Sequence, residues 1–277
     1  MDLSKERFKQ IRGELLGQTR RIVENLGRTP KLAIIQIGEN EASDIYIKNK
    51  VKTCQSVGIG VSILKVNSRI DHKELKIRIN ELVDVEKFSG VIVQLPLPYP
   101  ASIYEREILD SIPWYVDVDG LSKDSVGRLW TNELSLKPAT AEAVCAILDK
   151  DLEGQHISII NRSNLIGKPL MKMLLDRNAS VEVLHSKSDL HEIRDAFMRS
   201  DIVITGVGNT DLKRYYSGGD WIDCGIIRIP DGKICGDAGN LKLSRISPVP
   251  NGVGTLTTAC LARNVAKAEF IRELYKK

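Results

Sequence analysis

The chain contains 277 residues, of which 42% are hydrophobic and 27% charged, and both fractions are ordinary for globular proteins. This length favours two domains or one large α/β domain. The net charge of +4 is too small to predict a nucleic-acid partner, and no apolar run reaches transmembrane length. We therefore expect neither a nucleic-acid nor a membrane partner, while a local basic site for a small anion stays open.

The first half of the sequence alternates helical and extended patterns. An amphipathic helix is predicted at 3–26, strands at 31–38, 61–67 and 90–98, and a polar helix at 72–83. A further helix follows the first strand, because the polar segment ENEAS suits a helix start. Strands that alternate with helices predict parallel pairing and right-handed crossovers, so this half forms a βα sheet of its own.

A second α/β series begins near residue 140. Its predicted helices cover 139–150, 167–178 and 190–200, and its predicted strands cover 156–161, 180–185, 201–208 and 220–226. This order is typical of a mononucleotide-binding unit, and the boundary between the two series falls in the Gly- and Pro-containing stretch 119–140. ISPVPNGVGTLT then interrupts the pattern, and residues 256–275 form a predicted closing helix.

The segment SDIYIKNK follows the first predicted strand and contains a row of polar side chains. On a helix, Ser43, Tyr46 and Lys50 share one face, while Lys48 points elsewhere. Such a row is ordinary surface decoration when it stands alone. Here the helix begins at the carboxyl edge of a predicted sheet, where open α/β sheets bind ligands.

The five cysteines are scattered, without a CxxC pair or a nearby histidine cluster. This pattern predicts neither a metal site nor a disulfide framework, and reduced thiols fit a cytoplasm best. The N-terminal segment MDLSKERFKQIRGELL is charged and lacks the apolar core of a signal peptide. We expect a soluble, cytoplasmic protein.

A dinucleotide site is suggested by two loops, although the usual GxGxxG signature is absent. The loop RSNLIGKP contains Gly167 at a helix entry, and the alternative is a well-capped βα connection. The next strand ends in HSKS, where an enzyme selective for NAD carries an acidic residue. Arg162, Ser186 and Lys187 could instead hold a ribose phosphate, so NADP is favoured over NAD unless this is merely a solvated loop.

Two further motifs allow both a structural and a functional interpretation. Gln94 lies near the carboxyl end of the predicted strand in GVIVQLPLP, where its amide could bind a ligand or orient an amine. DVDG, from Asp117 to Gly120, could be a simple turn, or its acids could bind a nitrogen-rich heterocycle. Periodicity alone does not decide between these readings.

Taken in order, these motifs resemble those of the bifunctional methylenetetrahydrofolate dehydrogenase/cyclohydrolase family, usually called FolD. The resemblance covers nearly the whole chain and comprises Ser-x-x-Tyr-x-x-x-Lys, VQLPLP, DVDG, GRL, RSNLIGKP, HSK and PVPNGVG. It implies NADP-dependent oxidation of 5,10-methylenetetrahydrofolate to the methenyl compound, followed by hydrolysis to 10-formyltetrahydrofolate.

The resemblance also implies residue roles. Lys50 would be the central catalytic group, Tyr46 would stack on the aminobenzoyl ring, Gln94 would hydrogen-bond Lys50, and Asp119 would hold the pterin. The implied substrate-binding residues are Ser43, Tyr46, Gln94, Leu95, Pro96, Asp119, Pro250 and Gly252. The implied cofactor-binding residues are Asn161, Arg162, Ser163, Ile166, Gly167, His185, Ser186, Gly206, Gly208, Gly225 and Ile226.

The implied architecture is α/β with two domains. A folate-binding catalytic domain would span 1–137 and be completed by a helix at 256–277, which returns to it, and a Rossmann-like NADP-binding domain would span 138–255. Tetrahydrofolate derivatives are the implied partners, and a homodimer is expected from the family alone.

Several positions depart from the family pattern, most of them around the cofactor and inter-domain surfaces, and they are Val116, Ala139, Asn161, Asn251 and Thr255. Two other functions stay open: a dehydrogenase that has lost most of its hydrolase activity, and a non-catalytic dinucleotide-binding protein. The presence of both Lys50 and Gln94 argues against the first. The presence of Tyr46, Lys50, Gln94 and Asp119 together argues against the second.

Overall fold

The computed structural model describes residues 1–229 and 232–274. This part of the chain forms two compact units. The β1–β3 unit comprises Glu14–Ala139 and the chain from Thr258 onward, and the β4–β7 unit comprises Met1–Gly13 and Thr140–Thr257. Both contain parallel sheets with helices, so the predicted two-domain α/β class is confirmed.

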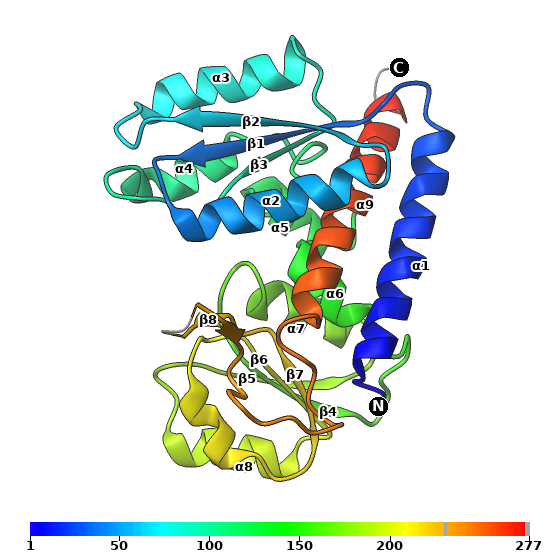
Figure 1. The fold of residues 1–277 in the computed structure, drawn as a ribbon, viewed down its shortest axis with the longest axis vertical. Coiled ribbons are helices and arrows are strands. Elements are labelled where there is room, and N and C mark those ends of the chain that lie inside the picture. The colour runs from blue at the N-terminus through cyan, green and yellow to red at the C-terminus, as the bar shows by residue number, and fades with distance from the viewer. Residues whose placement is uncertain (230–231, 275–277) are drawn as a thin grey trace. The chain divides into compact units, whose positions relative to one another are not determined.

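The sheet of the β1–β3 unit has the strand order β2-β1-β3, and both pairings are parallel. Its strands are β1 (Lys31–Ile37), β2 (Gly60–Val66) and β3 (Gly90–Val93). The central strand β1 is buried after its first residue, because α2 (Glu41–Gln55) and α3 (His72–Asp84) cover opposite faces of the sheet (Figure 1). The apolar run AIIQI therefore forms a strand that is buried on both faces.

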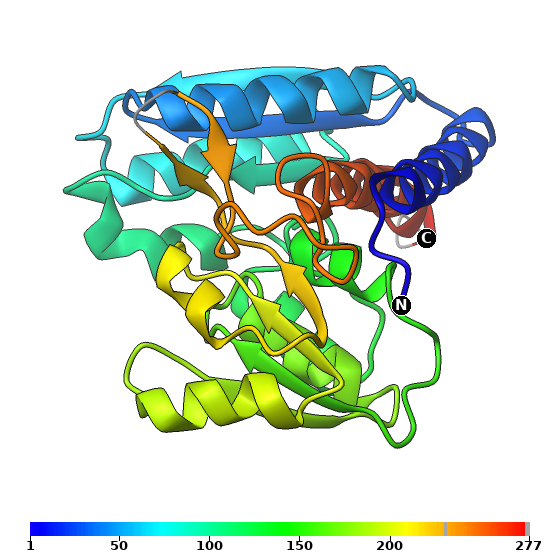
Figure 2. The ribbon, with the colours of Figure 1, turned by 60° about the horizontal axis from the view of Figure 1, so that its bottom comes forward.

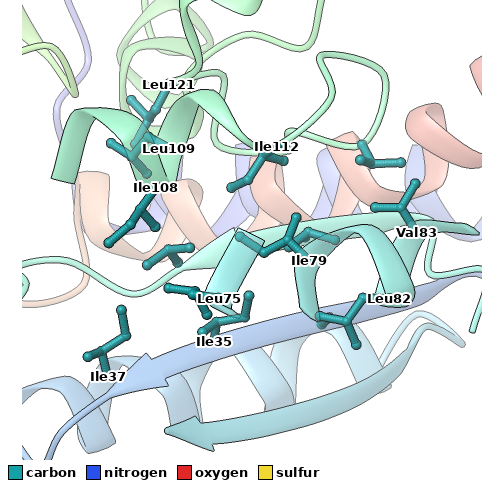
Figure 3. Close-up of a cluster of buried hydrophobic side chains, with 14 of the residues drawn as sticks. Ile35, Ile37, Leu75, Ile79, Leu82, Val83, Ile108, Leu109, Ile112 and Leu121 are labelled. Carbon is teal, nitrogen blue, oxygen red and sulfur yellow. The ribbon is translucent and has the colours of Figure 1, made fainter. Parts of the chain in front are cut away.

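One core of this unit lies between the sheet and two helices. The side chains of α3 repeat at helical spacing and meet Ile35 and Ile37 of β1, while residues in and after α4 (Glu105–Asp110) close the other side (Figure 3). The labelled helical residues of this cluster are Leu75, Ile79, Leu82, Val83, Ile108 and Leu109. Burial of each such side chain contributes about 1.5–3 kcal/mol, so this core holds β1 and β3 against the two helices.

The long C-terminal helix α9 (Val253–Leu274) is fastened to the β1–β3 unit by buried polar contacts. The Glu269 carboxylate, 0% exposed, pairs with the Arg28 guanidinium and accepts a hydrogen bond from Ser89 Oγ at 2.7 Å. Asn264 Nδ2 donates to the carbonyls of Val118 and Lys137. The predicted return of the C-terminal helix to the first unit is therefore observed.

The sheet of the β4–β7 unit has the order β5-β4-β6-β7, again all parallel. Its strands are β4 (His156–Ile160), β5 (Ser180–Leu184), β6 (Ile202–Thr205) and β7 (Asp220–Asp223), and the helices α7 (Gly167–Leu175) and α8 (Leu190–Arg199) connect them. Helix α8 begins with a capping box formed by Asp189 and Glu192, which explains its sharp start.

Some boundaries differ from the predictions. Strand β3 ends at Val93 rather than at 98, because the prolines that follow cannot donate to a sheet. Helix α6 (Ala139–Cys145) stops before 150, and α9 begins at Val253 rather than at 256. The remaining helices and strands are α1 (Lys5–Glu24), close to its predicted bounds, and the unpredicted η1 (Ala101–Tyr104), α4, α5 (Lys123–Trp130), η2 (Thr210–Tyr215), β8 (Ile227–Arg228) and β9 (Ile234–Cys235).

Strands β8 and β9 form a short antiparallel hairpin, drawn in orange in Figure 2. Strands this short carry little periodicity, so the sequence pattern could not reveal them. The hairpin matters because it brings the segment after β9 back toward the end of β7, as the contacts below describe.

Candidate active site

Each sheet contains one switch point, where two neighbouring strands have their following connections on opposite sides of the sheet because the strand order changes direction there. In the β1–β3 unit this point lies between β1 and β3, and in the β4–β7 unit it lies between β4 and β6. Open α/β sheets bind ligands outside the carboxyl ends of the strands at such a switch point. Many of the residues predicted to bind substrate or cofactor follow these strands.

Helix α2 begins directly after β1 and carries the predicted row. Its start is fixed by Asn40, whose side-chain oxygen accepts a hydrogen bond from the Ser43 N–H at 3.2 Å. Ser43 is buried, whereas Tyr46 and Lys50 are half-buried. Lys48 is exposed and lines a hollow between α2 and β2, so it lies apart from the row, as predicted.

The amine of Lys50 meets the amide of Gln94 at the switch point of the first sheet. Lys50 Nζ donates to Gln94 Oε1 at 3.0 Å, and Gln94 Nε2 donates to the carbonyl of Leu95 at 2.7 Å. The second bond fixes the orientation of the amide, so its oxygen must face the amine. Within the described chain no carboxylate forms an ion pair with Lys50, and a neutral group therefore aims this amine.

The two acids of DVDG have different environments. Asp117 is 1% exposed, and its Oδ2 accepts hydrogen bonds from Ser122 N and Ser125 Oγ, each at 2.7 Å. Burial raises the pKa of Asp117 to about 6. Asp119 is half-exposed, and the turn after it requires Gly120, which has a φ of +65°. Asp117 therefore supports the turn internally, while Asp119 is the acid presented by it.

The other predicted substrate residues lie on two segments. Leu95 packs against the core of the β1–β3 unit, and Pro96, which follows it, is exposed. Pro250 and Gly252 belong to the β4–β7 unit, in the segment before α9. Gly252 is buried, and a Cβ there would lie 2.1 Å from the carbonyl oxygen of Pro248, so close backbone approach explains this glycine.

The loop between β4 and α7 is organised by Asn161. Its Oδ1 accepts hydrogen bonds from Ser163 N at 2.8 Å and Gly167 N at 3.1 Å, and its Nδ2 donates to the Gly206 carbonyl at 2.6 Å. Asn161 is only 7% exposed, and Ile166 N donates to Ser163 Oγ. The amide thus bridges the loops that follow β4 and β6, at the switch point of the second sheet.

Arg162 and Ser186 lie after neighbouring parallel strands, because Ile160 of β4 is paired with Leu184 of β5. Both side chains are exposed, and His185 is half-buried. A guanidinium and a hydroxyl are donors that suit a phosphate, and the segment HSKS contains no carboxylate that would repel one.

The predicted glycines after β6 and β7 lie beside two buried acids that the sequence reasoning missed. Asp237 Oδ2 accepts a hydrogen bond from Val207 N at 3.0 Å, and Asp237 Oδ1 accepts one from Asn209 N at 2.8 Å. Gly208 has a φ of +71° in this loop. A Cβ at Gly225 would lie 2.5 Å from Asp237 Oδ1, so that position has no room for a side chain. Ile226, which follows, is exposed.

The second of these acids is Asp223, at the end of β7. Its Oδ1 accepts hydrogen bonds from Gly225 N at 2.8 Å and Asp237 N at 3.1 Å, and its Oδ2 accepts one from Ala238 N at 2.8 Å. Burial, together with the charge of Asp237, raises the pKa of Asp223 to about 6. The only sequence signal was that both acids stand next to or near glycines.

Within residues 1–229 and 232–274, no helix combines the length and apolar character needed to cross a membrane. In the same residues, no three side chains of His, Cys, Asp or Glu are grouped so that they could hold a metal ion.

Comparison with known proteins gives matches over both units. The family model for the catalytic domain of tetrahydrofolate dehydrogenase/cyclohydrolase matches residues 3–119, and the model for its NAD(P)-binding domain matches residues 138–272. The bifunctional protein FolD of Rickettsia akari is 36% identical over 281 residues, covering 94% of each chain.

Solved structures agree with these matches. The bifunctional FolD methylenetetrahydrofolate dehydrogenase/cyclohydrolase of Campylobacter jejuni has a TM-score of 0.86 at 34% identity and covers 97% of each chain. The FolD of Trypanosoma brucei, solved with NADP cofactor and an inhibitor, has a TM-score of 0.84 at 26% identity, covering 99% of this chain and 97% of its own.

Proposed function

Because the chain belongs to the tetrahydrofolate dehydrogenase/cyclohydrolase family, we propose how its two units divide the two reactions of that family. The protein oxidises 5,10-methylenetetrahydrofolate with NADP and hydrolyses the methenyl product to 10-formyltetrahydrofolate. The observation that carries this conclusion is the family match over both units. The β1–β3 unit binds folate and the β4–β7 unit binds NADP, and the family models that match each half support this division.

Lys50 is the proposed catalytic group for hydrolysis. Water adds to the carbon held between two nitrogens, one carbon–nitrogen bond breaks, and the formyl group stays on the other nitrogen. A proton must leave the adduct and a proton must reach the departing nitrogen, so an amine at this carbon can serve both transfers. The hydrogen bond from Lys50 Nζ to Gln94 Oε1 supports this role, since it orients the amine without placing a carboxylate beside it.

The remaining folate contacts follow from the same arrangement. Asp119 is proposed to accept hydrogen bonds from the nitrogen-rich edge of the pterin, because its carboxylate is half-exposed at the end of a fixed turn. Tyr46 is proposed to stack on the aminobenzoyl ring. Ser43, Leu95, Pro96, Pro250 and Gly252 are proposed to complete the substrate surface.

NADP, when bound, accepts the hydride of the oxidation. Arg162 and Ser186 are proposed to hold its ribose phosphate, because they are exposed at the ends of adjacent strands without a nearby acid in HSKS. The loops that contain Ser163, Ile166, Gly167, His185, Gly206, Gly208, Gly225 and Ile226 form the proposed remainder of the cofactor surface. The role of the chain in this step is to align the two reactants.

A cytoplasmic homodimer is also proposed. In the described chain the cysteines at 54, 145, 224, 235 and 260 form no disulfide with one another, which suits a reducing compartment. Family membership supports the dimer, and analytical ultracentrifugation of the purified chain tests it. A single species at the mass of one chain, 30.9 kDa, over the working concentration range contradicts it.

One assay tests both activities. The protein is mixed with 5,10-methylenetetrahydrofolate and either NADP or NAD, and the absorbances of reduced cofactor and of the methenyl intermediate are followed together. We expect reduced cofactor to form faster with NADP and the methenyl signal to decay by hydrolysis. Accumulation of methenyl product without enzymatic decay would instead identify a dehydrogenase that lacks hydrolase activity.

A further inference from the structure

The loop Gly206–Asn209 has an exposed outer surface and a firmly held backbone. Val207, Gly208 and Asn209 are exposed, yet the backbone of this loop is hydrogen-bonded to buried side chains from two sides. Asn161 Nδ2 donates to the Gly206 carbonyl, and the two oxygens of Asp237 accept from Val207 N and Asn209 N. A loop held in this way has little freedom to rearrange when a ligand arrives.

Asp237 is itself held by a second carboxylate. Asp223 accepts hydrogen bonds from the N–H groups of Gly225, Asp237 and Ala238, and so joins the end of β7 to the segment after β9. Both acids are nearly inaccessible, at 1% for Asp223 and 0% for Asp237. A Cβ at Gly236 would lie 2.2 Å from Asp223 Oδ2, so glycine there is required by this packing.

Two neighbouring buried carboxylates are costly, and burial without a counter-charge is rare. In the described chain neither Asp223 nor Asp237 forms an ion pair, and their charge is met by five backbone N–H groups instead. At the opposite end of β7, buried Asp220 pairs with Arg245 and with the terminal amine of Met1. On β7, the buried acid without a counter-charge therefore lies at the carboxyl end of the strand, the edge at which open α/β sheets bind ligands.

We propose that Asn161, Asp223 and Asp237 are positioning residues that hold the NADP-facing loops in their bound arrangement before the cofactor arrives. This inference rests on the proposed placement of NADP on those loops. The three side chains are buried and act through backbone, so they need not touch the cofactor. Their effect is to remove the ordering cost that flexible loops would impose on binding.

The test compares Asp237→Asn with Asp220→Asn. The two oxygens of Asp237 serve different donors, so an asparagine there must turn an N–H toward a backbone N–H, and one contact is lost. We expect Asp237→Asn to raise both the Kd and the KM for NADP about tenfold or more, with little change in kcat. Hydrolysis of methenyltetrahydrofolate, assayed without cofactor, should remain at the wild-type rate.

Asp220→Asn is the control, because it alters another buried acid of the same unit, at the opposite end of β7 from Asp223. It should lower the Tm and leave the Kd for NADP unchanged. The proposal is overturned if Asp237→Asn binds NADP as the wild type does, or if both variants lower kcat equally with unchanged KM. The latter result would mean that the acids serve only to stabilise the unit.

Hydrogen exchange on the wild-type protein keeps the proposal testable if Asp237→Asn does not fold. Without NADP, the amides of Val207 and Asn209 should be protected, and Asn161→Ala should speed their exchange and weaken NADP binding several-fold. Exchange at the rate of an unstructured peptide in the free wild type overturns the proposal. A wild-type protein that shows this protection but does not bind NADP would instead refute the proposed function.

Discussion

The switch points of the two sheets are built in opposite ways. Between β1 and β3, half-buried side chains present their own functional groups, and Lys50 is aimed by Gln94. Between β4 and β6, the buried Asn161 amide bonds back to the Gly206 carbonyl, and backbone forms the surface. The first arrangement depends on the identity of the presented groups, and the second depends on what lies beneath the loops. Substitutions of the presented side chains should therefore remove a functional group, whereas substitutions beneath the loops should disturb the position of the backbone.

The largest expected effect is at the amine of the first switch point. Lys50→Met should lower hydrolysis of methenyltetrahydrofolate by about 10²–10⁴-fold, the usual contribution of a proton-transferring group. Lys48→Met, two residues away on the exposed side of the same helix, should stay near the wild-type rate. The rate is measured as the decay of methenyl absorbance. Equal losses in both variants would show that hydrolysis does not depend on which side of α2 carries the lysine.

A smaller effect is expected in the loops that follow β4 and β5. Arg162→Ala should weaken NADP binding about tenfold to a hundredfold more than NAD binding, because a charged hydrogen bond to phosphate contributes about 1.5–3 kcal/mol. Lys168→Ala, which removes an exposed cation hydrogen-bonded to Asn164 on the same loop, is the control. Titration calorimetry with both cofactors measures the ratio of the Kd for NADP to the Kd for NAD. If Arg162→Ala leaves this ratio unchanged, Arg162 does not bind the ribose phosphate.

The buried acid of DVDG predicts a modest pH effect on stability. Because the pKa of Asp117 is raised from 3.8 to about 6, the folded state binds its proton more tightly than the unfolded state does. Its contribution to stability therefore falls as the pH rises from about 4 to 6 and stays low above that range. The two donors share one oxygen, so Asp117→Asn can keep both hydrogen bonds.

The difference in unfolding free energy between wild type and Asp117→Asn should change by about 2 kcal/mol between pH 4 and pH 7. Urea unfolding at several pH values measures it. Parallel pH profiles for wild type and Asp117→Asn would mean that Asp117 does not titrate in this range.

The sequence could predict which side chains of α2 share one face, but it could not predict the buried acids that hold the loops of the β4–β7 unit. Helical spacing placed Tyr46 and Lys50 on one face and Lys48 apart from them, and strand order put α2 at the carboxyl edge. Asp223 and Asp237 are 14 residues apart, and the short hairpin between them carries too little pattern to predict. Their pairing arises from tertiary packing, so neither acid appeared among the predicted cofactor residues.

Asn161 illustrates the same limit on one side chain. The family resemblance made it a candidate for contact with the cofactor. An amide has donors and an acceptor on one short stem, and sequence does not reveal whether they face a ligand or the backbone. In the structure all three of its hydrogen bonds reach backbone groups, which favours a positioning role over direct contact.

The central claim is that the Lys50 amine faces the one-carbon unit of bound folate. A crystal structure of the protein with NADP and a folate analogue tests this most directly. We predict that Lys50 Nζ lies within about 3 Å of the atom that stands for the one-carbon group or its attacking water, still bonded to Gln94. An amine turned to bulk solvent, with the analogue bound elsewhere, would contradict the account.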